Sequence, residues 1–244
     1  MKKIDINCDM GEGYGSYIVG NDEEVMPYIT SANIACGFHA GDPHIMNRTV
    51  EQAKSYGVAI GAHPGYPDLA GFGRRSIPMS TEEITNITLA QLGTLHSFCR
   101  AHKVDLHHIK PHGALYNDAA KNITIAHAII KAIKQFDDQL ILYGLANSAL
   151  IEAAIEAGIR VASEVFADRT YENDGSLTPR SQPNAVISNV NECVEQARRM
   201  INDKQVLTVT GELIPIDVDT ICIHGDSPHA LSIAQALRNM LNFN

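Results

Sequence analysis

Residues 34–46 read IACGFHAGDPHIM, and the fold prediction starts from this stretch. Its apolar run suits a buried strand, and Asp42 followed by Pro43 supplies a cap and a first residue for a helix. Residues 221–231, ICIHGDSPHAL, repeat the same corner late in the chain. Both corners therefore predict a strand that passes directly into a helix. The histidines in the two copies are not required by such a turn, and they indicate a function.

The same alternation of short apolar runs and helix-period segments continues along the whole chain without a long linker. This pattern is typical of parallel strands with crossover helices, so we expect an α/β protein, a TIM-like (β/α) barrel in a single domain over residues 1–244. Seven strands are predicted, at 3–7, 31–35, 58–62, 106–110, 140–144, 160–165 and 219–224. The segment 206–216 predicts a small hairpin insertion that turns at Gly211 and Glu212.

Helix start signals follow three of the strands. They are Asp42 before Pro43, Ser80 with Glu83 in capping-box spacing, and Ser227 before Pro228. Gly57 is placed to end the first of these helices, and the second is expected to run towards Arg100. The third is expected to be the C-terminal helix.

Charge and hydropathy narrow the range of partners. The chain has 244 residues, 45% of them hydrophobic, and 19 Lys and Arg against 28 Asp and Glu give a net charge of -9. Because no basic stripe could neutralise phosphates, nucleic acid is not an expected partner. The charged residue Asp5 comes before any apolar run of the kind that forms the core of a signal peptide. No apolar run has the roughly 18 residues of a membrane span. We expect a cytoplasmic protein with no membrane partner.

Cysteine spacing predicts neither a disulfide framework nor a zinc site made of thiolates. The chain has 5 cysteines at wide spacings, without a CxxC pair. An odd count of this kind indicates reduced, buried thiols. The phosphate loop GxxxxGK[ST], the dinucleotide motif GxGxxG and the GxSxG nucleophile elbow are also absent from the sequence.

Polar side chains gather where the predicted strands end. In a parallel barrel these ends open on one face, which is where such folds keep their chemistry. The opposite ends carry ordinary turn residues, so we expect a shared active site at the first face. The residues that follow or end the strands are Asn7, Asp9, Cys36, His39, His63, Lys110, His112, Glu164, Asp168, His224 and Asp226.

Several of these residues have an alternative structural interpretation. Asp9 and Glu12 lie in a glycine-punctuated loop of the prediction, where a carboxylate activates water, holds a metal or simply caps a turn. His44 follows His39 by five positions, but its place in a first helical turn favours a solvent-facing ring. Lys110 in a buried strand needs an ion partner or a function, since an unpaired charge there costs several kcal/mol.

Three segments extend the candidate site beyond the strand ends. The segment GFGRR at 71–75 offers free backbone N–H groups beside two guanidiniums, and such a combination is a plausible anion-binding site. KPHGALYN at 110–117 adds Tyr116 and Asn117. The polar segment 164–180 supplies Arg169, for which a salt-bridged surface loop is the alternative.

Taken together, the motifs resemble one family along almost the whole chain. They are DINCDMGEGYG (5–15), TSANIACGFHAGDP (30–43), GVAIGAHPGYPD (57–68), FGRR (72–75), HIKPHGALYN (108–117), EVFADRTYENDGSLTPR (164–180) and ICIHGD (221–226). The family is that of the 5-oxoprolinase A subunits, the lactam-utilisation family, also described as a glycoside hydrolase/deacetylase-like barrel. The hairpin segment and the last helix match less distinctively.

The resemblance implies ATP-driven opening of 5-oxoproline to L-glutamate, with release of ADP and phosphate, in a complex with subunits B and C. ATP would be a co-substrate, used with Mg²⁺, and no tightly bound cofactor is implied. A homo-oligomer is also compatible with it. Because a five-membered lactam is a poor electrophile, phosphorylation of the amide oxygen would create a leaving group and open the ring carbon to water.

The residues are assigned to this chemistry as follows. Asp9 is the general base, with His39 and His63 holding or polarising the water. Lys110 and Arg74 meet phosphate or the substrate carboxylate, and His112 protonates the ring nitrogen. Substrate or phosphate binding is expected from Asn7, Glu12, Arg74, Tyr116, Asn117, Glu164, Asp168, Arg169, His224 and Asp226.

The same residues are compatible with two other functions. Asp9, His39 and His63 could hold a divalent metal in a carbohydrate deacetylase that uses no ATP. Alternatively the chain is a non-catalytic subunit that presents substrate, an interpretation favoured by the missing nucleotide loop. Metal analysis separates the first from the ATP-dependent enzyme, and calorimetry with ATP separates the second.

Overall fold

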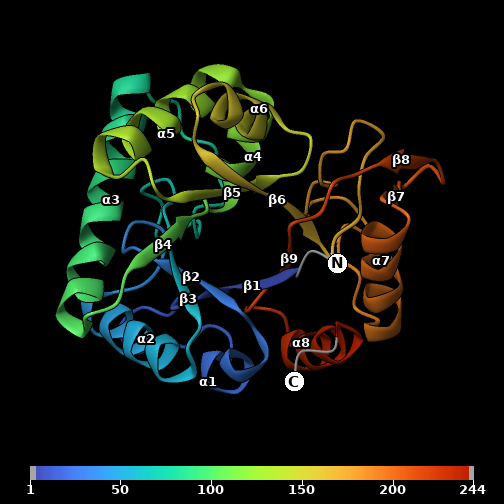
Figure 1. Ribbon diagram of the computed structural model, residues 1–244, viewed down its shortest axis with the longest axis horizontal. Coiled ribbons are helices and arrows are strands. Elements are labelled where there is room, and N and C mark those ends of the chain that lie inside the picture. Colours follow the sequence, from blue (N-terminus) through green and yellow to red (C-terminus); the bar gives the residue numbers. More distant parts are fainter. Residues whose placement is uncertain (1–3, 242–244) are drawn as a thin grey trace.

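The computed structural model of the chain describes residues 4–241. Parallel strands close into a barrel in the order β1-β2-β3-β4-β5-β6-β9 (Figure 1). Their bounds are β1 Asp5–Met10, β2 Ser31–Ala35, β3 Ala59–His63, β4 Leu106–Ile109, β5 Ile141–Leu145, β6 Arg160–Phe166 and β9 Thr220–Ile223. The ring closes because β9 pairs with both β1 and β6. The predicted barrel of seven parallel strands is confirmed.

Helices surround the strands, as the βαβ connections require (Figure 1). They are α1 Asp22–Val25, the 3₁₀ helix η1 Met26–Tyr28, α2 Pro43–Tyr56, α3 Thr81–His102, α4 Gly113–Lys121, α5 Ile123–Phe136, α6 Ala149–Glu156, α7 Val190–Asn202 and α8 Ala230–Met240. None of the helices in the described part of the chain combines the length and the apolar character needed to cross a membrane.

Two of the three helix starts lie where the sequence places them. The Asp42 carboxylate accepts from the backbone N–H of His44 at 2.8 Å and caps α2. Gly57 ends that helix at φ 67°, a left-handed conformation that glycine adopts without strain. The capping box of Ser80 and Glu83 begins α3.

The third predicted start, at Ser227 and Pro228, is wrong. Helix α8 begins at Ala230, and its N-cap His229 makes no side-chain cap. The Ser227 hydroxyl instead accepts from the His229 N–H at 3.2 Å inside a turn. The residues after β9 therefore form a loop at the barrel mouth before the helix starts.

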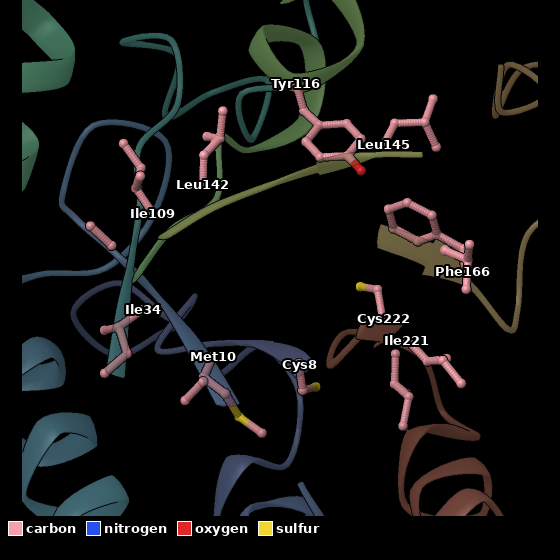
Figure 2. Packing of buried hydrophobic residues seen from close by; sticks show 14 of the residues in the cluster. Cys8, Met10, Ile34, Ile109, Tyr116, Leu142, Leu145, Phe166, Ile221 and Cys222 are labelled. Atoms are coloured by element: carbon pink, nitrogen blue, oxygen red, sulfur yellow. The ribbon is translucent and has the colours of Figure 1, made fainter. Parts of the chain in front are cut away.

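The first strand extends further than predicted. It runs to Met10, so Asp9 lies within a strand and not in a loop; residue 3, where the prediction began, falls outside the described residues. Side chains alternate along a strand, and here Asn7 and Asp9 face the barrel interior while Cys8 and Met10 pack outside it. Figure 2 shows Met10 and Ile221 directed towards the surrounding helices and Cys222 towards the interior.

The hairpin predicted at 206–216 is two short antiparallel strands, β7 Gln205–Leu207 and β8 Leu213–Pro215. The backbone N–H of Thr208 donates to the Glu212 carbonyl at 2.8 Å and closes the turn. This sheet lies beside α7, away from the strands of the barrel (Figure 1). It leaves the seven-stranded ring uninterrupted.

Below the mouth, the barrel interior is filled with polar side chains that bond to one another. The Asn33 amide donates to Asn7 Oδ1 at 2.8 Å and to Asp9 Oδ1 at 2.9 Å. His108 Nε2 lies 2.8 Å from Asn33 Oδ1, which binds the His108 ring to the same network. Gly61 faces that ring, and a Cβ at this position would overlap it. A satisfied network of this kind holds each member in one orientation.

Candidate active site

A cavity of about 530 Å³ opens at the carboxyl end of the barrel strands. This is the face on which the sequence predicts the site. The predicted residues that line it are Asp9, Glu12, His63, Arg74, Lys110, His112, Tyr116, Asn117, Arg169, His224 and Asp226. Side chains from distant parts of the chain therefore converge on one hollow, as expected.

The remaining predicted residues, Asn7, His39, Glu164 and Asp168, do not line the cavity. Each is at most 1% exposed and lies behind a residue that does line it. Asn7, predicted to bind substrate or phosphate, belongs to the interior network and donates to Thr220 Oγ1 at 2.7 Å. The role of His39 in catalysis and the roles of Asn7, Glu164 and Asp168 in substrate or phosphate binding stay predictions. The four residues support the side chains in front of them.

Lys110 lies at the floor of the cavity, and its side chain is 3% exposed. Its Nζ is 2.9 Å from Asp9 Oδ1, 2.9 Å from Glu164 Oε1 and 3.0 Å from Cys222 Sγ. Burial alone would lower the pKa of the ammonium, but these three neighbours outweigh it and raise the pKa well above its usual range. The buried charge therefore has the partners that the sequence requires of it.

Asp9 accepts from Lys110 and Asn33 through Oδ1 and turns Oδ2 towards His63, whose Nε2 is 3.4 Å away. Burial would raise the pKa of this carboxyl. The charge that His63 carries when protonated, together with the Lys110 ammonium, outweighs that effect and holds the pKa well below its ordinary value. Asp9 is consequently an ionised acceptor with one oxygen directed at the cavity.

Two histidines meet above Asp9. His63 Nδ1 lies 2.7 Å from the Lys110 carbonyl, and His112 Nε2 lies 2.8 Å from the Phe72 carbonyl. Their other ring nitrogens, His63 Nε2 and His112 Nδ1, are 2.9 Å apart. The His39 ring stacks on His112 with centroids 3.7 Å apart and planes 5° from parallel.

Glu12 completes this group from the loop after β1. Its Oε1 is 3.4 Å from His112 Nδ1 and 3.8 Å from His39 Nε2. Burial, with the charges of Asp9 and Asp226, raises the pKa of Glu12 well above its usual range. Glu12, His39, His63 and His112 each offer a ligand atom within 4.8 Å of the others. The metal set predicted from the sequence included Asp9 in place of Glu12 and His112.

The opposite wall carries two hydrogen-bonded pairs. Tyr116 donates to Glu164 Oε2 at 2.6 Å, and burial together with that carboxylate raises the pKa of the phenol well above its usual range. His224 Nδ1 lies 2.9 Å from Asp168 Oδ2. The His224 ring also stacks on Phe166, with centroids 5.4 Å apart. Asp168 and Phe166 thus hold the imidazole in one orientation at the edge of the cavity.

Of the two arginines in the anion-binding site predicted at 71–75, only one lines the cavity. Arg75 forms an ion pair with Asp68 and is not among the cavity residues. Arg74 does line the cavity, and its Nη2 lies 2.5 Å from Asp226 Oδ2. Arg180 and Lys121 also reach the mouth. The rim therefore combines three cationic side chains with the carboxylates of Asp118 and Asp226.

Arg169 and Asn117 bond mainly to the backbone. The guanidinium of Arg169 donates to the carbonyls of Ala185 and Thr178 and organises its own loop. These carbonyl contacts replace the salt bridge of the alternative interpretation. The Asn117 amide donates to Gly113 O at 3.1 Å. Both residues shape the cavity wall.

Cys222, Phe166, Asn33 and His108 belong to the site or its support, and they are missing from the residues predicted on sequence alone. A signal exists for some of them. His108 precedes Lys110 by two positions, so both side chains leave the same face of the chain. Cys222 stands two positions before His224 in the same way. Asn33 is itself a signal, because asparagine is uncommon in strands. Phe166 resembles an ordinary strand residue and has no comparable signal.

A family model, named relatives and a solved structure all relate this chain to the same group of proteins. Residues 4–244 match the family model described as LamB/YcsF family. A protein of Tolumonas auensis, which bears the name of the A subunit of 5-oxoprolinase, is 56% identical over 241 residues, covering 99% of this chain and 96% of the relative. One of the same name from Brevibacillus brevis is 54% identical over 242 residues, covering 99% and 95%. The crystal structure of the lactam utilization protein from Thermus thermophilus superposes with a TM-score of 0.93 at 44% identity, covering 99% and 96%.

Proposed function

The chain belongs to the LamB/YcsF family, and on that basis we propose that it is the A subunit of a 5-oxoprolinase. The reaction is the ATP-dependent hydrolytic opening of 5-oxo-L-proline to L-glutamate, with ADP and phosphate released. The word subunit in the names of the relatives supports an assembly, and we propose subunits B and C as its other members.

The observation that carries this proposal is the arrangement of Asp9, Lys110 and His63 at the cavity floor. Opening a lactam by water requires an acceptor for the water proton and a polar, water-restricted place for charge to develop. Asp9 presents an ionised oxygen to the cavity, and Lys110 holds the other oxygen at 2.9 Å. The pair supplies an acceptor whose position is fixed.

We assign Asp9 to the attacking water, with His63 Nε2 beside the same oxygen at 3.4 Å. Lys110 is a positioning residue in this scheme, because its ammonium is already shared by Asp9 and Glu164. We assign anion binding to the rim, where Arg74, Lys121 and Arg180 line the cavity. These cations suit the carboxylate of 5-oxoproline or a phosphate group.

Protonation of the leaving ring nitrogen is better matched by His224 than by His112. The Nε2–H of His112 is bonded to a backbone carbonyl, and burial lowers the pKa of this ring well below its usual range. His224 is oriented through Nδ1 by Asp168 and lines the cavity with its other edge. A histidine oriented by a buried carboxylate is a common proton donor and acceptor.

ATP and Mg²⁺ remain part of the proposal for the assembled enzyme. The rim cations fit a polyphosphate, but the chain has no phosphate-binding glycine loop of a known type. The residues of this chain therefore bind and orient the lactam, and the phosphoryl donor is shared with the partner subunits. A metal-dependent deacetylase with Asp9 as ligand is less well supported, since Oδ1 of Asp9 is engaged by Lys110 and Asn33.

A reconstitution assay tests the proposal. The chain is incubated with 5-oxoproline, ATP and Mg²⁺, with and without subunits B and C, and glutamate and ADP are measured. We expect glutamate in proportion to ADP only when all subunits are present. Glutamate formation by B and C at an unchanged rate without this chain would overturn the proposal.

A further inference from the structure

His63 Nε2 and His112 Nδ1 lie at hydrogen-bond distance, but in neutral rings neither nitrogen carries a hydrogen to donate. A backbone carbonyl only accepts hydrogen bonds, so the Lys110 carbonyl places the hydrogen of His63 on Nδ1. In the same way the Phe72 carbonyl places the hydrogen of His112 on Nε2. His63 Nε2 and His112 Nδ1 then face each other with lone pairs at 2.9 Å. Two lone pairs at that distance repel unless a cation lies between or beside them.

Two further groups next to this contact lack hydrogen-bond partners. Glu12 Oε1 and both ring nitrogens of His39 are buried without one. Glu12 is 5% exposed and His39 1% exposed. A buried carboxylate or imidazole without a partner costs on the order of 1 to 3 kcal/mol or more. The cluster is therefore rich in electron pairs and poor in donors.

We propose that Glu12, His39, His63 and His112 bind one divalent transition-metal ion, with zinc as the best match. Donors bound at about 2.0 to 2.1 Å to a common ion lie roughly 2.9 to 3.4 Å apart for right-angled to tetrahedral arrangements. The separations found are 2.9 Å between His63 and His112, 3.4 Å between His112 and Glu12, and 3.8 Å between Glu12 and His39. Three imidazoles and a carboxylate are ligands that zinc accepts.

The surroundings of the ligands fit the same conclusion. Histidines that bind metals usually donate their second N–H to a carbonyl or carboxylate, which fixes the tautomer. His63 and His112 both do so. His39 lies flat on His112, so its ligation requires the ring to turn out of that stack. The ring has no hydrogen bond to lose in turning.

A shared proton is the competing explanation, and it accounts for less. A proton on His63 Nε2 would satisfy His63 and His112, but it would leave Glu12 Oε1 and His39 without partners. One metal ion reaches all four groups. The second group of potential ligands, Asp9, Cys222 and His224, is excluded because the Lys110 ammonium contacts both Asp9 and Cys222.

Metal binding is measured on the chain alone, without substrate or nucleotide, so its outcome does not depend on the proposed reaction. The protein is stripped with a chelator and titrated with Zn²⁺ by calorimetry, and Co²⁺ is added to a second sample to record its visible absorption. The variants are Glu12→Gln and His112→Ala. His44→Ala is the matched control, because His44 is an exposed histidine on helix α2 outside the cluster.

We expect one Zn²⁺ per chain for the wild type and for His44→Ala. Affinity should fall on the order of 100-fold or more in each of the two ligand variants, with the cobalt spectrum changed in parallel. Circular dichroism checks that the variants are folded. Anomalous diffraction from zinc-loaded wild-type crystals gives an independent result, with a peak expected between Glu12 and His112. The inference would be overturned by the absence of stoichiometric binding, by wild-type affinity in both ligand variants, or by an anomalous peak at Asp9 and Cys222.

Discussion

The Asp9 carboxylate and the Lys110 ammonium lie 2.9 Å apart at the floor of the barrel mouth, although they are 101 positions apart in the sequence. Lys110 also holds Glu164 at 2.9 Å, so one cation balances two buried carboxylates. The pairing determines the charge of the cavity floor. It also makes Lys110 important for folding as well as for function.

Lys110→Met should destabilise the protein strongly. The change leaves Asp9 and Glu164 buried without a counter-charge, and breaking a buried pair in this way costs about 3 to 5 kcal/mol. Urea denaturation measures the loss in free energy of unfolding. Lys131→Met, at an exposed position on α5, is the control and should stay within about 0.5 kcal/mol of the wild type. Similar stability of the two variants would contradict the role of the pair.

Asp9→Asn should remain folded and lose activity in the reconstituted complex. The amide keeps the shape of the carboxylate but cannot take a proton from water, and loss of a general base costs on the order of 100-fold or more in kcat. The rate of glutamate formation is the measurement. Asp105→Asn, at an exposed position just before β4, serves as the control. Wild-type kcat in Asp9→Asn would exclude the assignment.

His224→Gln tests the proposed proton donor. Because His224 is oriented by Asp168 at 2.9 Å, its replacement should lower kcat on the order of 100-fold with a smaller change in KM. Asp168→Asn should give an intermediate loss, since the amide oxygen still orients the ring but carries no charge. A pH profile of kcat that loses one limb in His224→Gln but keeps it in Asp168→Asn would support proton transfer. A change in KM alone would indicate substrate binding instead.

Gly61→Ala should destabilise the barrel interior. Its Cβ would overlap the His108 ring, which is fully buried, hydrogen-bonded to Asn33 and stacked on Tyr143. Overpacking of this kind costs about 1 to 3 kcal/mol. Gly93→Ala on α3 is the opposite case, because the space around that Cβ is open and alanine favours helix by roughly 0.5 to 1 kcal/mol. Thermal denaturation should therefore show a lower Tm for the first variant and an unchanged or higher Tm for the second.

Asp42 should make stability depend on pH in the acid range. Hydrogen bonds from the backbone N–H groups of Ile45 and Gly15 lower the pKa of this carboxyl. The contribution of Asp42 to the free energy of unfolding is therefore complete above the ordinary aspartate pKa. It is lost as the pH falls through the lower pKa that Asp42 has in the folded protein. Asp42→Ala should be less stable than the wild type by about 1 kcal/mol near neutral pH. The difference should shrink on acidification, and a difference that grows with falling pH would contradict this sign.

Local signals account for most of the fold prediction. Asp42 and Ser80 act on N–H groups within three residues, so the sequence alone places the starts of α2 and α3. Ser227 has the same appearance but fails, because the loop after β9 is held by a distant contact. Arg74 bonds to Asp226 across the mouth, 152 positions away. A cap can be predicted only where no such contact reshapes the backbone.

The position of Asp9 shows a second limit. Its polarity suggests a loop, whereas Cys8 and Met10 on either side of it are buried against the helices. In a barrel with a polar interior, the inward residues of a strand need not be apolar. Alternation of Asn7 and Asp9 with Cys8 and Met10 is the signal of a strand that faces such an interior.

Strand and helix signals in the amino-acid order were enough to establish a seven-stranded barrel and the end of it that bears the reactive groups, because each signal acts over a few residues. The partners of those groups depended on folding. Closure of β9 onto β1 and β6 brings Cys222 to 3.0 Å from Lys110, and the neighbouring strands bring His63 to 2.9 Å from His112. Such distances follow from strand register around a closed ring, and a shift of one residue would turn each side chain to the outside.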